Sequence, residues 1–184
     1  MSISANILLI EDSPTSAMAT KAMLSHIHNI DVNLTISMTL AEGLTQIHDN
    51  LDVILLDLTL PNGRGVEVLR KVLRRSTPFG IPVIVLSGDE SPSTVFACAK
   101  VGADEYIPKA NASPEILAAT ISLLLKIKRF ELRMQRSEIT LEAADSLKKL
   151  TELPNTIGSS FVARDSFIDT RIPITDGVMT GRTK

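Results

Sequence analysis

The sequence of 184 residues lacks tryptophan and has a single tyrosine and a single cysteine, Cys98. One cysteine excludes an internal disulfide and any metal site built from several cysteines. The sequence also lacks a large excess of charge of either sign, since the formal net charge is −2. The charge balance therefore does not favour nucleic acid or an anionic membrane as a partner. No apolar run approaches the roughly 18 residues of a membrane helix, and the first residues carry no basic segment typical of a secretory signal. We therefore expect a cytoplasmic protein with no membrane partner.

Short apolar runs alternate with longer amphipathic stretches along the first two-thirds of the chain. The runs at 7–10, 32–36, 53–56, 83–86 and 105–107 are predicted as strands, and three of them are apolar throughout, as is typical of strands covered on both faces. Helix starts follow at Ser13, Thr39, Gly65, Ser91 and Ser113, where capping residues, or proline at the first helical position, are typical of a helix N-terminus. Five strands alternating with five helices predict an α/β fold with a doubly wound, five-stranded parallel sheet.

The last predicted helix extends beyond the sheet domain, because no Gly or Pro occurs from 115 to 153. Apolar residues recur there in steps of three, four and once seven, a spacing typical of a coiled-coil seam; they are Leu123, Ile127, Phe130, Met134, Leu141 and Ala144. We expect a domain at 4–127 and a helical extension at 128–153 that pairs two copies as a parallel coiled-coil homodimer. The alternative is a helix that folds back on its own domain or is partly disordered. The segment 154–184 is expected to be a tail, disordered or the start of a truncated output domain.

Polar side chains follow the predicted strands at the edge of the sheet where parallel strands end. Glu11 and Asp12 follow the first strand, Asp57 the third, Ser87 the fourth and Lys109 the fifth. Sites in such sheets form at this edge. Three close carboxylates repel one another unless a cation joins them, and their hard oxygen ligands favour Mg²⁺. The set predicts phosphoryl transfer to Asp57, with the lysine pairing with phosphoryl oxygens and the serine hydroxyl bonding another.

The motifs around these residues are Ile-Leu-Leu-Ile-Glu-Asp at 7–12, Val-Ile-Leu-Leu-Asp-Leu-Thr-Leu-Pro-Asn-Gly at 53–63, Val-Ile-Val-Leu-Ser-Gly at 83–88 and Gly-Ala-Asp-Glu-Tyr-Ile-Pro-Lys at 102–109. Together they resemble the receiver domain of two-component response regulators, of the chemotaxis-regulator type, over about 4–127. The resemblance implies a flavodoxin-like fold with strand order 2-1-3-4-5. It also implies a histidine kinase or phosphotransfer protein as the donor of a phosphoryl group to Asp57.

The same resemblance assigns roles to the remaining residues. Mg²⁺ would be held by Glu11, Asp12, Asp57 and the backbone carbonyl of Thr59. Ser87 and Tyr106 would form the switch pair, with the serine moving toward the phosphoryl group and the aromatic ring turning inward. One position departs from the family pattern, because Ala110 stands where a proline usually follows the lysine. This substitution leaves the role of Lys109 intact but puts the usual geometry of the loop in doubt.

We expect a response regulator that signals by a conformational or dimerisation change through the C-terminal helix, and no output enzyme domain. One alternative is a receiver that serves as a scaffold without phosphorylation. Another is the regulatory half of a truncated diguanylate cyclase, because the segment 150–155, Leu-Thr-Glu-Leu-Pro-Asn, is similar to the entry of that domain. A phosphohydrolase of the haloacid-dehalogenase type would need an acid at Thr59. The basic residues of the long helix, which are Lys126, Lys128, Arg129, Arg133 and Arg136, are predicted as a solvated face rather than a nucleic-acid site.

Overall fold

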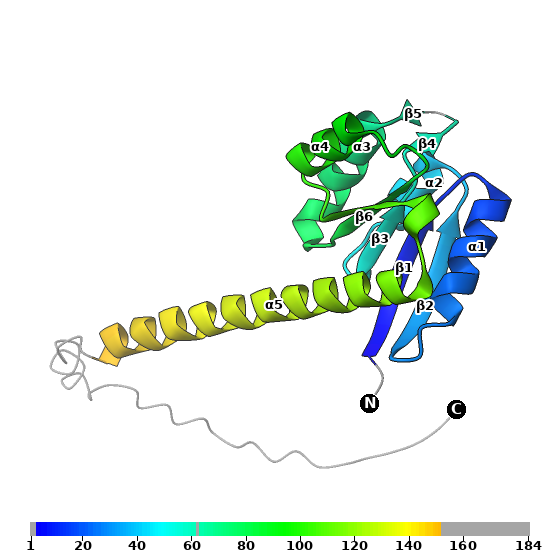
Figure 1. Ribbon diagram of the computed structural model, residues 1–184. Coiled ribbons are helices and arrows are strands. Elements are labelled where there is room, and N and C mark those ends of the chain that lie inside the picture. The colour runs from blue at the N-terminus through cyan, green and yellow to red at the C-terminus, as the bar shows by residue number, and fades with distance from the viewer. Residues whose placement is uncertain (1–2, 62, 152–184) are drawn as a thin grey trace, which may run out of the picture. The chain divides into compact units, whose positions relative to one another are not determined.

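The computed structural model describes residues 3–61 and 63–151, which divide into a first unit ending at Ile139 and a second beginning at Thr140. In chain order the elements are β1 (Ile3–Ile10), α1 (Pro14–Ser25), β2 (Ile30–Ser37), α2 (Leu40–Gln46), β3 (Val53–Leu56), β4 (Thr59–Leu60), β5 (Gly63–Arg64), α3 (Val66–Ser76), η1 (Thr77–Phe79), β6 (Val83–Ser87), α4 (Pro92–Val101), β7 (Glu105–Pro108), η2 (Lys109–Asn111) and α5 (Pro114–Thr151). Figure 1 shows the sheet between helices on both of its faces.

The main sheet has five parallel strands in the order β2-β1-β3-β6-β7. This confirms the predicted doubly wound sheet and its strand order. The register pairs Ile10 at the end of β1 with Leu56 at the end of β3, and Leu56 with Val85 of β6. The carboxyl ends of the central strands therefore lie level with one another, and the residues that follow them share one edge of the sheet.

Two hydrophobic layers cover the sheet, one on each face. Side chains of β1, β3 and β6 alternate between the layers, so the central strands are buried on both sides. On one face they pack against α2, α3 and α4, through residues such as Leu40, Leu69 and Cys98. On the other face they pack against α1 and the first turns of α5, through Leu24 and Leu117. Burial on both faces explains why the central strands are apolar throughout.

The predicted helix starts are found at the expected residues. The Ser13 hydroxyl accepts a hydrogen bond from the amide of Ser16, and Thr39 accepts one from Glu42. Ser91 also occupies the N-cap position, but its hydroxyl accepts no capping bond from a backbone amide of the helix. Its hydroxyl donates to the Thr94 hydroxyl instead, and its amide donates to the Asp89 carboxylate.

The segment between β3 and α3 holds a feature that the sequence did not predict. No strand was expected between 57 and the helix start at Gly65, whereas β5 pairs there with β4 as a short antiparallel ribbon. Gly65 follows this ribbon with φ of 63°, a left-handed conformation that favours glycine. The ribbon lies directly after the candidate nucleophile and fixes the path of the chain there.

α5 is one continuous helix to Thr151, as predicted, and the expected helix end near 153 and the tail at 154–184 lie outside the described residues. Leu117, Ile121 and Leu125 are buried against the sheet. The prediction of a fully solvated basic face was wrong at Lys128, whose Nζ donates to the Leu51 carbonyl at 2.7 Å. Its side chain is only 15% exposed, and the ammonium reaches a backbone acceptor instead of solvent. None of the helices in the described ranges is long and apolar enough to span a membrane.

Candidate functional site

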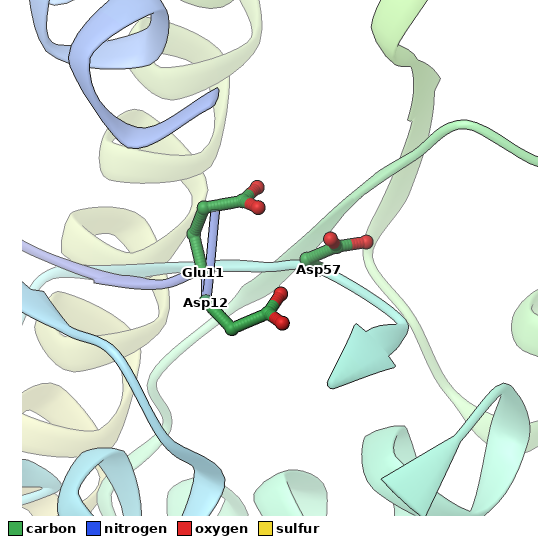
Figure 2. Close-up of side chains that lie close together, drawn as sticks. All are labelled: Glu11, Asp12 and Asp57. Atoms are coloured by element: carbon green, nitrogen blue, oxygen red, sulfur yellow. The ribbon is translucent and has the colours of Figure 1, made fainter. Parts of the chain in front are cut away.

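Two of the predicted acids are placed directly by the ends of the central strands. The Glu11 amide donates to the Ser37 carbonyl of β2 at 3.0 Å, and the Asp57 amide donates to the Ile10 carbonyl at 2.9 Å. These bonds continue the parallel ladder one residue beyond β1 and β3. Figure 2 shows the carboxylates of Glu11, Asp12 and Asp57 gathered at this edge. The predicted convergence of the three acids is therefore observed.

The three carboxylates form a compact and largely dry cluster. One oxygen from each of Glu11, Asp12 and Asp57 lies within 4.8 Å of the other two. Glu11 is 1% exposed and Asp57 4% exposed. Burial raises the pKa of the Glu11 carboxyl above its ordinary value, and the charge of Asp57 adds to this effect, although the hydrogen bond from Lys109 opposes it. The cluster thus concentrates negative charge where water screens it poorly.

Lys109 lies between the two buried acids. Its Nζ is 2.6 Å from Glu11 Oε2 and 2.9 Å from Asp57 Oδ2. Burial by itself lowers the pKa of the ammonium, but the hydrogen bonds and charges of the two carboxylates outweigh it, so the pKa lies above its ordinary value. The turn η2 begins at Lys109 and contains Ala110, so the lysine reaches the acids without the usual proline after it.

Backbone amides bind the second oxygen of each buried carboxylate. The Ser13 amide donates to Glu11 Oε1 at 3.2 Å, and the Thr59 amide donates to Asp57 Oδ1 at 3.1 Å. Each carboxylate is thereby oriented from two sides, by one amide and by the Lys109 ammonium. This contact is made by the Thr59 amide, whereas the role expected for Thr59 was metal binding through its carbonyl.

The donor set fits a hard divalent cation. Three carboxylates within reach of one point offer oxygen ligands only, which suits Mg²⁺ better than softer metals. A single ammonium leaves a net negative charge among these four side chains, which a dication would offset. Glu11, Asp12 and Asp57 are the side chains that would hold it.

Ser87 and Tyr106 lie on neighbouring strands beside the acids. Ser87 ends β6, is fully buried, and its hydroxyl accepts a hydrogen bond from the Asp89 amide at 3.2 Å. It contributes to the wall of a cavity of about 370 Å³, together with Thr59 and Asp89. Tyr106 lies on the edge strand β7, and its hydroxyl donates to the Asp89 carbonyl. Burial raises the pKa of the Tyr106 phenol.

The backbone of Asp89 connects the two expected switch residues, since its amide donates to the Ser87 hydroxyl and its carbonyl accepts the Tyr106 hydroxyl. The sequence reasoning missed this residue. Its carboxylate accepts hydrogen bonds from the Thr94 hydroxyl at 2.7 Å and from the Ser91 amide at 2.8 Å. The bond from Thr94 is the main cause of a lowered pKa for this carboxyl, with the bonds from Ser91 next. The signal that could have indicated these carboxylate bonds is an aspartate two residues before a helix N-cap, since such side chains bind nearby backbone amides.

Comparisons with known proteins agree with this geometry. A family model for the response regulator receiver domain matches residues 7–121. The response regulators MprA of Mycobacterium bovis and of Mycobacterium leprae are each 36% identical over 98 residues, which is 51% of this chain and 42% of each relative. The chain therefore spans less than half the length of these curated relatives.

Solved structures of similar chains extend over the same region. The CheY-like receiver domain protein of Methanospirillum hungatei is 27% identical with a TM-score of 0.59, covering 71% of this chain and 99% of that one. A receiver domain protein from Clostridium thermocellum is 26% identical with a TM-score of 0.60, covering 68% of this chain and 98% of the other.

Proposed function

The chain belongs to the response regulator receiver domain family, and on that premise we propose that Asp57 accepts a phosphoryl group from a histidine kinase or phosphotransfer protein. The observation that carries the proposal is the position of Lys109, whose ammonium joins the carboxylates of Glu11 and Asp57 inside a three-acid cluster. A structural ion pair would need one acid. Three acids and one ammonium instead suit a site that binds a cation and an anionic phosphoryl group together.

In the proposed reaction a carboxylate oxygen of Asp57 attacks the phosphorus atom of the donor. An oxygen–phosphorus bond forms, the bond from phosphorus to the donor histidine nitrogen breaks, and the electron pair of that bond stays on the imidazole. Mg²⁺, held by Glu11, Asp12, Asp57 and the carbonyl of Thr59, would supply charge neutralisation for the phosphoryl oxygens. The Thr59 amide binds one carboxylate oxygen of Asp57. This bond fixes the orientation of the carboxylate and thereby the direction from which it attacks phosphorus.

Lys109 and Ser87 act on the product in this proposal. The Lys109 ammonium donates to Asp57 Oδ2 at 2.9 Å. When Asp57 is phosphorylated, its carboxylate loses its negative charge, and a phosphoryl oxygen would then pair with the ammonium in its place. The Ser87 hydroxyl leaves its bond with the Asp89 amide and donates to another phosphoryl oxygen. Tyr106 then turns inward, and its bond to the Asp89 carbonyl couples the ring to the loop that moves with the serine.

The signal would leave the domain through α5 as a change in dimerisation. Beyond the turns packed on the sheet, the helix carries apolar side chains that its own domain leaves exposed, including Phe130 and Met134. A second copy of the chain is the proposed partner for this surface. A coiled-coil homodimer buries such a stripe without requiring another protein.

Intact mass spectrometry tests the phosphoacceptor. After incubation with acetyl phosphate and Mg²⁺ we expect the mass of one phosphoryl group to be added to the wild type, and no addition without Mg²⁺. Asp57→Asn should stay unmodified, because an amide cannot form the acyl phosphate. Asp49→Asn, a change at an exposed acid, is the matched control and should be modified like the wild type.

Phosphorylated Asp57→Asn would show that another residue accepts the group. If the folded wild type takes up nothing from acetyl phosphate or from a phosphorylated phosphotransfer protein, the chain is an unphosphorylated scaffold and the proposal fails.

A further inference from the structure

Four of the apolar side chains that α5 leaves exposed within the first unit form one stripe along the helix. Leu123, Ile127, Phe130 and Met134 are 58%, 44%, 64% and 48% exposed. Their spacing of four, three and four residues keeps them on one side of a helix that turns about 100° per residue. Their exposure means that the helix does not fold this face back onto its own domain. A partner is needed to cover it.

Charges of opposite sign flank this stripe. Lys126 and Arg133 lie along one flank, and Glu131 and Glu138 lie along the other, each pair seven residues apart. All four side chains are exposed. Within the described residues, none of the four forms an ion pair inside the chain. The four charges are therefore available to pair with charges of a partner.

In coiled-coil terms the stripe defines a heptad register. Ile127 and Met134 occupy a positions, and Leu123 and Phe130 occupy d positions. The basic residues Lys126 and Arg133 then occupy g, and the acidic residues Glu131 and Glu138 occupy e. These e and g positions border the seam and determine orientation and choice of partner.

We propose that two copies of α5 pair in parallel and in register, with Lys126 beside the partner's Glu131 and Arg133 beside the partner's Glu138. This rests on the dimerisation proposed above and specifies its orientation and its contacts. In a parallel pair each g residue faces the e residue five positions further along the other helix. Both basic residues meet an acid by that rule, and two-fold symmetry repeats each contact.

The antiparallel arrangement is disfavoured by the same charges. When two identical helices run in opposite directions, g positions face g positions and e positions face e positions. The basic residues would then face one another across one flank and the acidic residues across the other, and like charges at these distances are destabilising. Leu132 and Ile139 lie on the opposite side of the helix and continue the line of Leu125, so they do not compete for this seam.

Charge reversal tests the proposed contacts. One variant carries Glu131→Lys and Glu138→Lys, and the other carries Lys126→Glu and Arg133→Glu. Each variant alone places like charges on both flanks, so its self-association measured by sedimentation should weaken about tenfold or more relative to the wild type. An equal mixture of the two restores opposite charges, and native mass spectrometry should show the mixed dimer with nearly wild-type affinity.

Two results of that experiment would overturn the proposal. Variants that each self-associate as strongly as the wild type would place the interface elsewhere, and a mixture that stays monomeric would exclude the stated contacts. All four positions lie outside the acid cluster, so phosphoryl uptake by the variants reports that they are folded. A wild type that takes up phosphate yet stays monomeric at every concentration, phosphorylated or not, overturns the pairing and leaves the phosphoacceptor function standing.

Disulfide trapping tests the orientation. In a Cys98→Ala background, Met134→Cys should give a cross-linked dimer on mild oxidation, because a residues face each other in a parallel pair and face d residues in an antiparallel one. Leu132→Cys, on the opposite side of the helix, is the matched control and should cross-link at least tenfold more slowly. Equal rates at the two positions, or no cross-link at Met134→Cys, would contradict a parallel pair.

Discussion

At the scale of single residues, the main feature of the site is that its buried negative charges outnumber its positive charges. Glu11 and Asp57 are almost fully buried, and one ammonium, that of Lys109, serves both. Removing a buried partner from such a set leaves an uncompensated charge, which is far costlier than losing an exposed ion pair. The cluster is therefore expected to respond strongly to a bound cation and to the loss of the Lys109 ammonium.

Magnesium should stabilise the folded protein through these acids. At a Mg²⁺ concentration about a hundred times the dissociation constant, the free energy of unfolding should rise by about 2.7 kcal/mol. Asp12→Asn should lose most of that increase because it removes one of the three carboxylates. Without Mg²⁺ it should be at least as stable as the wild type, since repulsion within the cluster is relieved.

Urea unfolding with and without Mg²⁺ measures both effects, with Asp49→Asn as a control that keeps the full response. An Asp12→Asn variant with an undiminished response to Mg²⁺ would remove this residue from the metal site.

Asp104 should make stability depend on pH. Its Oδ2 accepts the Val83 amide at 2.8 Å, but burial raises the pKa of its carboxyl above the ordinary value of 3.8. The folded state then holds this proton more tightly than the unfolded state, so the contribution is fully present below 3.8 and is lost as the pH rises through the folded pKa. Asp104→Asn should remove that loss and be more stable at neutral pH, by less than about 1 kcal/mol because solvent screens the site.

Unfolding curves recorded across this acidic window provide the measurement. A variant whose stability keeps the wild-type slope with pH would show that Asp104 does not cause the slope.

At the scale of elements, the layers are held together by close contacts between helices and the central strands. One such contact lies between α2 and β1. A Cβ atom added at Gly43 would lie 2.6 Å from Ile10 Cδ1 and 2.8 Å from Ile10 Cγ1. Such distances require the isoleucine to move, and Ile10 is fully buried directly before the acids. The glycine is thus explained by the approach of the helix to the strand.

Gly43→Ala should destabilise the fold by about 1–3 kcal/mol through overpacking, although alanine favours a helix by about 1 kcal/mol relative to glycine. Chemical denaturation gives the free energy of unfolding. Ile10→Val removes the nearest methyl group, so the double variant should be less destabilised than the sum of the two single variants. A fully additive double variant, or a stabilised Gly43→Ala, would mean that the contact is relieved without cost.

At the scale of the whole molecule, α5 serves two purposes along its length. Its first turns complete the core through Leu117, Ile121 and Leu125, and Lys128 binds the Leu51 carbonyl. Beyond that point every described side chain of the first unit is exposed or borders the stripe proposed to pair two chains. The domain and the pairing surface should therefore be separable by truncation, and the contact of Lys128 places the cut after it.

A chain that ends at Arg129 should be a folded monomer that still takes up a phosphoryl group. It keeps the buried turns of α5 and loses Phe130, Met134 and the charges beyond them. Light scattering coupled to gel filtration gives the mass of the particle, and intact mass gives phosphoryl uptake. A truncated chain that remains a dimer would place the interface on the receiver domain itself.

Much of the fold and the membership of the acid cluster could be predicted without the structure. The apolar runs predict five strands. The rule that parallel strands end at one edge predicts that Glu11, Asp57 and Lys109 lie close together. The predicted runs are too short at β1 and β2, where Ala5 and Asp31 extend the strands toward the N-terminus. Polar residues interrupt the apolar pattern there, while the hydrogen-bonded ladder of the sheet continues through them.

What the sequence by itself determined was local or periodic: which segments form strands and helices, where the helices begin, and which acids follow the strands. What only the tertiary structure decided were contacts between segments far apart in the chain. Lys109 bonds both Glu11 and Asp57. Asp89 joins Ser87 to Tyr106 through its backbone. The Lys128 ammonium donates to a loop carbonyl. Periodicity encodes which face of an element is apolar, but the partner of a polar atom depends on how the elements pack, because a hydrogen bond forms only within about 3 Å.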